Sequence, residues 1–234
     1  MDDPDLTAWY ADHLDAVVDL HLPARPRGSV LLVHGGFWKQ RWDRTHTRPM
    51  ARALAGLGYV VATPEYRRVG GGGGWPRTWQ DVEAAADALP SLCAEAGTRW
   101  TAPVVVGHSA GGHLALLLAG SARPLAGVVA LAPVADLRAA IDLSLGDEAA
   151  AAFLDGADPA EADPMGRAPV PGRRVEIVHG RGDLDVPVSL SRDYHARHPD
   201  TVLTELDCGH MELITPGSVA WEPVVHAVRN AHDG

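Results

Sequence analysis

The sequence predicts an α/β domain built around a largely parallel β-sheet. Short runs of β-branched or apolar residues recur along the chain, and stretches with a helical spacing of apolar residues separate them. Such alternation is typical of parallel strands joined by helices that cover both faces of the sheet. The chain has 234 residues, of which 46% are hydrophobic, so a single domain of this size can bury a sizeable core.

The first predicted strand, Val18–Leu22, differs from the others. Its apolar residues alternate with Asp19 and His21, which predicts a half-exposed antiparallel strand at the edge of the sheet. Six further apolar runs predict buried strands: Ser29–His34, Tyr59–Ala62, Pro103–Gly107, Gly127–Leu131, Arg174–His179 and Thr201–Leu206. The sheet is therefore expected to contain at least seven strands.

The segments between these strands predict helices. They are Arg44–Leu57, Arg77–Ala96, Ala110–Ser121, Val188–His198 and Ser218–Ala231. Pro76 suits the first turn of the second helix, and Gly58 and Gly97 follow two of the helices as typical C-terminal stops.

Two segments stand outside this alternation. Residues 136–173 are rich in Ala, Asp, Pro and Gly, which predicts a short cap or lid inserted into a single domain spanning residues 1–234. Residues 70–74 are five successive glycines, which predict a mobile loop because glycine restricts the backbone least.

Composition and charge restrict the partners. The formal net charge is −10, whereas nucleic acids and anionic membranes are bound by basic surfaces. No apolar run reaches the length of a membrane span, and the acidic N-terminus differs from a basic secretory signal. We therefore expect a cytoplasmic monomer or homodimer with reduced thiols at Cys93 and Cys208 and a small molecule as its partner.

The motif with the clearest chemistry is Gly-His-Ser-Ala-Gly at 107–111. It ends an apolar run and begins a helical pattern, so Ser109 is expected on a sharp turn between a strand and a helix. Gly107 and Gly111 supply the small flanks that let strand and helix approach each other. Such a turn presents the serine Oγ as a nucleophile and directs the next backbone N–H, that of Ala110, toward a developing oxyanion.

A second motif, His-Gly-Gly-Phe-Trp at 34–38, directly follows an earlier predicted strand. A loop at this place can donate backbone N–H groups to the same oxyanion. We expect Gly36, together with Phe37, to provide these donors opposite Ala110.

A serine nucleophile needs a general base and a carboxylate that orients the base. The loop after the strand at 174–179 carries Asp183 and Asp185, of which Asp183 is the preferred orienting carboxylate and Asp185 the alternative. The loop after the last predicted strand carries His210, the expected general base. Nucleophile, acid and base thus follow one another in the chain order Ser, Asp, His.

The other histidines suit structural roles. His34 and His179 end strands beside the site and are expected to shape its loops by hydrogen bonding. His195 and His198, three residues apart on a predicted helix, suit a solvated helix face, so no metal site is expected.

Aromatic residues are concentrated in the loops around this site. We expect Trp38, Trp75 and His108 to contact the substrate. The rings expected near the mouth of the site, where they would either stack on an aromatic group or serve in packing, are Phe37, Trp38, Trp42, Trp75 and Trp79.

In this order the motifs resemble those of the α/β-hydrolase fold, and the resemblance covers nearly the whole chain. The motif at 34–38 is similar to the His-Gly-Gly-aromatic-Trp of kynurenine formamidases (arylformamidases) and related small carboxylesterases. The segments 107–114, 65–67, 75–76 and 210–214 also resemble this group, whereas Arg68 and the glycines at 70–74 depart from it.

The resemblance implies a serine hydrolase that cleaves a small carboxylic ester or an aryl formamide through an acyl-enzyme. Its triad would be Ser109, His210 and Asp183, and it would need neither metal nor cofactor. The alternatives are a kynurenine formamidase proper, an acyltransferase of a biosynthetic pathway that uses the same triad, and a non-catalytic binding protein with the same fold.

Overall fold

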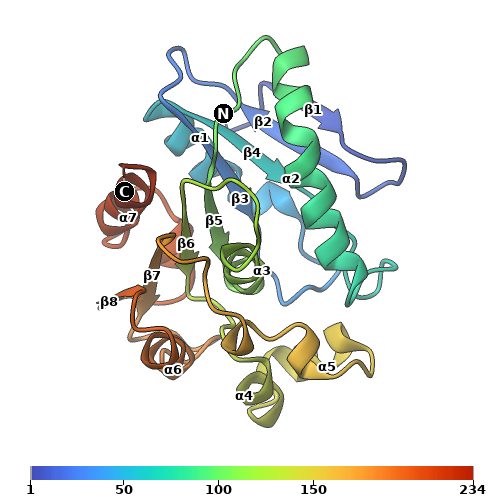
Figure 1. Ribbon diagram of the computed structural model, residues 1–234, viewed down its shortest axis with the longest axis vertical. Helices are drawn as coiled ribbons and strands as arrows, with labels where there is room; N and C mark the ends of the chain where they lie inside the picture. The colour runs from blue at the N-terminus through green and yellow to red at the C-terminus, as the bar shows by residue number, and fades with distance from the viewer. Residues whose placement is uncertain (1, 234) are drawn as a thin grey trace.

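The computed structural model describes residues 2–233, which form one eight-stranded sheet with helices packed against it (Figure 1). Across the sheet the strands follow the order β1-β2-β4-β3-β5-β6-β7-β8, and every neighbouring pair from β4 onward is parallel. The strands are β1 (Leu6–Trp9), β2 (Val17–His21), β3 (Gly28–Val33), β4 (Tyr59–Pro64), β5 (Val104–His108), β6 (Gly127–Leu131), β7 (Arg174–Gly180) and β8 (Val202–Leu206). The predicted α/β class with a mostly parallel sheet is confirmed.

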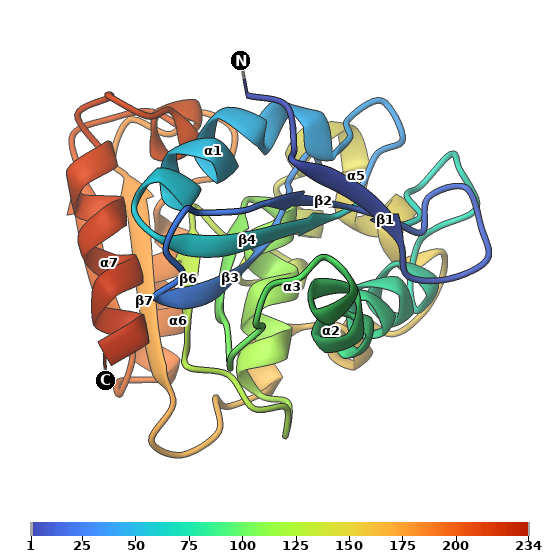
Figure 2. The same cartoon turned by 90° about the horizontal axis from the view of Figure 1, so that it is seen from above.

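Helices cover both faces of this sheet, as predicted (Figure 2). On one face lie α1 (Arg48–Gly56) and α7 (Trp221–Asp233), and on the other α2 (Arg77–Glu95), α3 (Ala110–Ala119) and α6 (Ser189–Arg197). Successive side chains of a strand point to opposite faces. In β3, therefore, Val30 and Leu32 join the core under α1 and α7, and Leu31 and Val33 join the core under α2 and α3.

The prediction that residues 18–22 form a half-exposed edge strand is wrong. β1 pairs antiparallel with β2 and forms the edge, and all five residues of β2 are buried. The alternation with polar residues was misleading because Asp19 is buried as an ion pair. Its two carboxylate oxygens lie 3.0 Å from Arg44 Nη2 and 2.9 Å from Arg48 Nη2.

Three further expectations differ in detail. β8 is only half-buried, because it forms the other edge of the sheet. The helix expected at 44–57 divides into a 3₁₀ turn, Arg44–Thr47, and α1, and the side chain of Asp43 caps the turn. The last helix begins at Trp221, three residues later than expected.

The glycines at 70–74 form a defined turn, where the sequence suggested a mobile loop. The backbone N–H groups of Gly71 and Gly73 donate to the carbonyl oxygen of Arg68, and Gly74 N–H donates to Thr78 Oγ1. A Cβ at Gly73 would overlap the backbone of Arg67. A glycine at position 73 therefore allows this turn to lie directly against the backbone of Arg67.

Residues 136–173 contain α4 (Leu137–Asp142), α5 (Leu145–Leu154) and two 3₁₀ turns. Phe153 of α5 is fully buried, and its carbonyl oxygen accepts a hydrogen bond from Trp75 N–H. That this segment acts as a cap stays a prediction, as does the single-domain division of the chain.

Within residues 2–233, no helix combines the length and the apolar character that crossing a bilayer requires. Both cysteines, Cys93 and Cys208, are free and buried.

Glycines let α3 pack tightly against β5 and β3. A Cβ at Gly107 would overlap the carbonyl oxygen of Gly111, and a Cβ at Gly111 would overlap the carbonyl oxygen of Val33. The first turn of α3 therefore touches the backbone of two strands, and no larger residue fits there without a backbone shift.

We predict that Gly111→Ala destabilises the protein by about 3 kcal/mol or more, since the clash involves backbone that cannot rotate away. The matched control is Gly56→Ala in α1, where a Cβ would meet nothing within 4 Å and where removal of a helical glycine adds about 0.5–1 kcal/mol of stability. Urea denaturation of both variants measures the difference. Equal stabilities would contradict the packing argument.

A second prediction concerns His113 of α3, which joins this helix to the segment 136–173. Its Nε2 lies 2.8 Å from the carbonyl oxygen of Ala162, its Nδ1 has no hydrogen-bond partner among residues 2–233, and burial lowers the pKa of the ring to about 4. The unfolded chain takes up this proton near pH 6.5, so the stability due to neutral His113 is complete above that pH and declines toward pH 4. Between these two pH values the contribution of His113 to the free energy of unfolding falls by about 3 kcal/mol, because each unit of pKa difference corresponds to about 1.4 kcal/mol.

His113→Gln keeps an amide donor for Ala162 but does not titrate. Urea denaturation at about pH 7 and about pH 4.5 is expected to show a smaller loss of unfolding free energy in this variant than in the wild type. The same pH dependence in both proteins would show that His113 is not the group responsible.

Candidate active site

Ser109 stands on the turn between β5 and α3. Its backbone has φ +57° and ψ −117°, a conformation that costs about 1–3 kcal/mol for a residue with a side chain and persists only where the surroundings enforce it. The close contacts of Gly107 and Gly111 enforce it here. The turn has the strand-to-helix form that the motif at 107–111 predicts.

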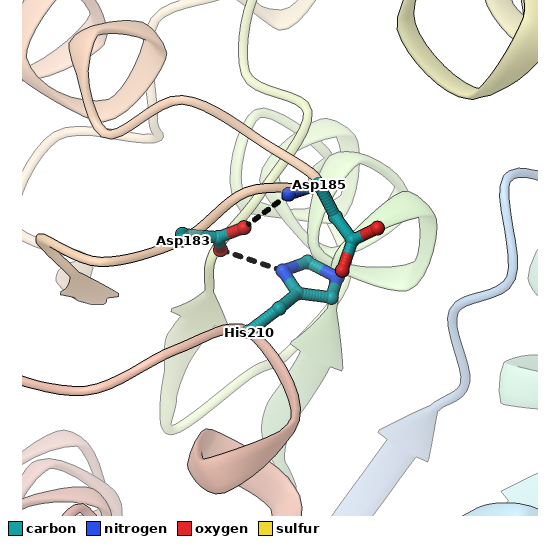
Figure 3. A group of neighbouring side chains, drawn as sticks. All are labelled: Asp183, Asp185 and His210. Carbon is teal, nitrogen blue, oxygen red and sulfur yellow. Dashed lines mark hydrogen bonds and ion pairs between the residues drawn. The ribbon is translucent and has the colours of Figure 1, made fainter.

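His210 and Asp183 meet across two loops that follow adjacent parallel strands, β8 and β7. His210 Nδ1–H donates to Asp183 Oδ2 at 2.6 Å (Figure 3). Asp183 Oδ1 accepts the backbone N–H groups of Asp185 and Val186, each at 2.9 Å. The buried carboxylate is therefore fixed by its own loop and faces the imidazole.

The surroundings of Asp183 keep it ionised. Burial alone would raise the pKa of this carboxyl, but hydrogen bonds from His179 and His210, the charge of His210 and the Val186 N–H together lower the pKa well below its usual range. His179 is the second imidazole on this carboxylate, with its Nε2 at 3.3 Å from Oδ2. The nearer partner of this Nε2 is the carbonyl oxygen of Val186 at 2.9 Å, and Nδ1 lies 2.7 Å from Ser191 Oγ. His179 thus shapes the loop by hydrogen bonding, as the sequence suggested.

Asp185, the alternative acid, has a different position. Its side chain is exposed and lies beside the imidazole without a hydrogen bond to His210 (Figure 3). One ligand atom from each of Asp183, Asp185 and His210 lies within 4.8 Å of the others, a spacing that a metal ion could bridge. Asp183 and His210 are already joined through a proton, however, so this group is better matched to proton transfer than to metal binding.

A pocket of about 130 Å³ brings several of the predicted site residues together. It is lined by Gly36, Phe37, Arg41, Trp42, His46, His108, Ser109, Asp185, His210 and Met211. Ser109 and His210 share this pocket, although within residues 2–233 no hydrogen bond joins Ser109 Oγ to the imidazole. Such bonds are often long in proteins without substrate.

The loop with the His-Gly-Gly-Phe-Trp motif lies against the serine turn. A Cβ at Gly35 would lie 2.7 Å from the carbonyl oxygen of His108 and 3.1 Å from Ser109 Cβ. Gly36, Phe37 and Trp38 have φ values of +107°, +52° and +55°, so the chain bends sharply past Ser109. Gly36 and Phe37 reach the pocket, and Ala110 begins α3 directly beside the serine.

Trp38 and Trp75, which were also expected to contact the substrate, lie outside the lining of this pocket. Trp38 is 1% exposed and stacks on Phe153 with 4.5 Å between ring centroids, away from the pocket lining. Trp75 packs edge-on against Phe153, and its indole N–H donates to Glu161. Both rings pack against Phe153 of α5. Contact with this residue removes more of their apolar surface from water than a place at the open mouth of the pocket would.

Among the other aromatic residues, Phe37 and Trp42 line the pocket and Trp79 does not. His108 also lines it, and its Nε2 lies 3.1 Å from the carbonyl oxygen of His210. Burial lowers the pKa of His108 well below its usual value, so the ring is neutral and donates this hydrogen bond. His108 thereby ties the serine turn to the loop of His210.

Sequence reasoning missed three residues of the pocket. Met211 directly follows His210 and could have been found from that adjacency. Arg41 and His46 lie beyond the loop 34–38, in a stretch without a recognisable motif, and only the fold brings them to Ser109.

Solved structures share this fold over nearly the whole chain. A truncated carbohydrate esterase from gut microbiota has a TM-score of 0.82 at 15% identity, covering 100% of this chain and 98% of its own. Esterase B from Lactobacillus rhamnosis has a TM-score of 0.77 at 22% identity, covering 98% and 86%. Esterase 2 from Thermogutta terrifontis, phosphonylated by sarin, has a TM-score of 0.77 at 19% identity, covering 94% and 91%.

At such identities these likenesses show the fold, which is that of the α/β-hydrolases implied by the motifs. No curated protein matches the sequence. The model of one family, BD-FAE, matches residues 18–141, more than half of the 234 residues, and the chain therefore belongs to the BD-FAE family of the α/β-hydrolase superfamily.

Proposed function

We propose that this protein is a serine hydrolase that cleaves small carboxylic esters through an acyl-enzyme. One observation carries the proposal: Ser109 and His210 line the same pocket, and His210 Nδ1 lies 2.6 Å from the buried carboxylate of Asp183. A base oriented by an ionised acid beside a serine on a strained turn is the constellation that activates a hydroxyl for acyl transfer.

In the proposed acylation step, Ser109 Oγ attacks the ester carbonyl carbon while His210 Nε2 accepts the hydroxyl proton. The carbonyl oxygen becomes an oxyanion, which the backbone N–H groups of Gly36 and Ala110, with Phe37 as a further donor, stabilise. The bond to the alcohol then breaks, and the imidazolium gives its proton to the leaving oxygen. Asp183 stabilises the imidazolium and keeps Nδ1 protonated throughout.

Deacylation repeats the same steps with water. His210 takes a proton from the water, the hydroxide attacks the acyl carbon, and the proton returns to Ser109 Oγ as the acid leaves. The net reaction consumes one water and yields one acid and one alcohol. An alcohol that replaces water gives acyl transfer by the same route, so product analysis separates these two outcomes.

The size and lining of the pocket support a small substrate. A volume of about 130 Å³ suits a short acyl group, and the rings of Phe37 and Trp42 on its wall suit a planar or aromatic one. The esterases among the solved structures of this fold also support ester hydrolysis. Aryl formamides are the second candidate, favoured by these two rings and by the motif at 34–38.

The proposal predicts that Ser109→Ala lowers kcat on p-nitrophenyl acetate by about three powers of ten or more, because the nucleophile is removed. Ser121→Ala is the matched control and is expected to retain activity, because Ser121 follows the C-terminal end of α3, donates to the carbonyl oxygen of Leu118 and does not line the pocket. N-formylkynurenine assayed beside the ester shows which substrate class turns over faster. Wild-type protein that neither turns over a substrate nor labels with a fluorophosphonate would favour the non-catalytic alternative.

A further prediction separates the two acids of the loop after β7. Asp183→Asn is expected to lower kcat by about 10⁴-fold, since the amide no longer holds His210 in the correct tautomer. Asp185→Asn is expected to stay within about 10-fold of the wild type, because Asp185 makes no hydrogen bond to the imidazole. Steady-state kinetics on both variants, with circular dichroism as the test of folding, decides the assignment. The reverse order of losses would identify Asp185 as the orienting acid.

A further inference from the structure

His34 is a fully buried side chain that the proposed mechanism does not use. It directly follows β3, and its ring stacks on Tyr66 with 4.2 Å between centroids and 6° between planes. Its Nδ1 lies 2.8 Å from the carbonyl oxygen of Gly35, and its Nε2 lies 2.7 Å from Glu65 Oε1. Both ring nitrogens therefore face oxygen atoms at hydrogen-bond distance.

Glu65 accepts hydrogen bonds on both of its oxygens. Oε1 also receives the Tyr66 N–H at 3.1 Å and lies 3.0 Å from Arg68 Nη1, and Oε2 receives the Arg44 N–H at 3.0 Å. Burial would raise the pKa of this carboxyl, but His34, Arg68 and the Arg44 N–H lower it below its usual value. Independently of His34, the guanidinium of Arg68 and two backbone N–H groups already face both oxygens of Glu65. These donors leave no place for a carboxyl proton, so Glu65 is a carboxylate with no proton to donate.

The charge of His34 follows from these two acceptors. A neutral imidazole has one N–H and one bare lone pair, so it can satisfy the Gly35 carbonyl or the Glu65 carboxylate, but not both. The unsatisfied nitrogen would then face an oxygen lone pair at 2.8 Å or less without a proton between them. An imidazolium satisfies both contacts, and the paired carboxylate of Glu65 balances its buried charge.

This charge has a direct route to the pocket. The Gly35 carbonyl belongs to the same planar peptide unit as the Gly36 N–H, and the two groups point in opposite directions. A hydrogen bond to the carbonyl fixes this plane and polarises the N–H at its other end. Gly36 lines the pocket beside Ser109, and in the described part of the chain its N–H has no other partner.

We propose that His34 is an imidazolium that orients and polarises the Gly36 N–H, and that Glu65 balances its charge. Both are positioning residues, and the inference rests on the proposed function, in which this N–H stabilises the oxyanion. A cationic donor behind the peptide strengthens the Gly36 N–H most when negative charge develops on the substrate oxygen, so it stabilises the transition state more than the bound ester.

Other groups around His34 are compatible with this charge. The titratable and charged groups that face His34 or its partner are Asp43, Arg44, His46, Glu65, Tyr66 and Arg68. Burial, and then the charge of His34, lowers the pKa of His46, which leaves that ring neutral. Burial also raises the pKa of Tyr66 well above its usual value, so the stacked phenol stays protonated.

The charge is tested in the wild-type protein by NMR with ¹⁵N-labelled histidine at about pH 8, where free histidine is neutral. The His34 signals are assigned from their loss in His34→Gln. Protons on both ring nitrogens are expected, and a neutral ring would overturn the inference. This measurement requires no known substrate.

The catalytic role is tested with Glu65→Gln, which removes the negative charge that balances a charged His34 and nearly keeps the shape of the side chain. Glu176→Gln is the matched control, because it makes the same change at a buried, Arg-paired carboxylate of β7 that does not contact His34 or the segment 65–68. We expect Glu65→Gln to lower kcat on p-nitrophenyl acetate by about 10- to 100-fold with little change in KM. The affinity for a trifluoromethyl ketone, which binds as an oxyanion, is expected to weaken by the same factor.

Kinetic loss in Glu65→Gln without weaker ketone binding, or an equal loss in Glu176→Gln, would overturn the oxyanion role. The outcomes also separate this inference from the function on which it rests. A neutral His34 in an active wild-type enzyme overturns the inference alone. Wild-type protein without ester turnover overturns the proposed function and, with it, the catalytic part of the inference.

Discussion

The pocket depends on close backbone contact between the serine turn and the end of β3. Gly111 touches the carbonyl oxygen of Val33, and Gly35 approaches His108 and Ser109 so closely that neither glycine has room for a side chain. These contacts hold Ser109 in a backbone conformation that it would not adopt alone, and they set the distance between the nucleophile and the loop that would bind the oxyanion. Every other part of the candidate site is arranged around this fixed pair of backbones.

Buried ion pairs also stabilise the region around the end of β3. Arg44, in the segment after β3, joins two buried carboxylates: its guanidinium pairs with Asp19, and its backbone N–H donates to Glu65. Glu65 in turn contacts the first residue of the loop 34–38. A buried carboxylate is costly unless all its lone pairs are satisfied, so these pairs fix the geometry of the loop more than they add to overall stability. The polar residues of this half of the sheet therefore position backbone groups.

Much of the fold and the centre of the site could be predicted because they depend on local patterns. Alternation of apolar runs and helical spacing predicts the parallel strands, and the chain order of Ser109, Asp183 and His210 places all three at the carboxyl ends of strands. The burial of β2 could not be predicted, since it requires that Asp19 meet two arginines from a distant turn. The same limit applies to Trp38 and Trp75, whose partner Phe153 is more than 70 residues away in sequence. A sequence pattern shows that an aromatic residue lies near a site but not which way its ring points.

The adjacent side chains of Phe37 and Trp38 point into different compartments. Phe37 lines the pocket, whereas Trp38 stacks on Phe153 of α5, and Lys39 Nζ next to them donates to the carbonyl oxygen of Gly146 at 2.6 Å. The backbone that would hold the oxyanion is thus also the anchor of residues 136–173. Any change of volume at Phe153 must be absorbed either by α5 or by this short loop, because the well-packed interior between them leaves little space. A substitution in residues 136–173, far from Ser109 in sequence, therefore shifts the loop that would hold the substrate carbonyl.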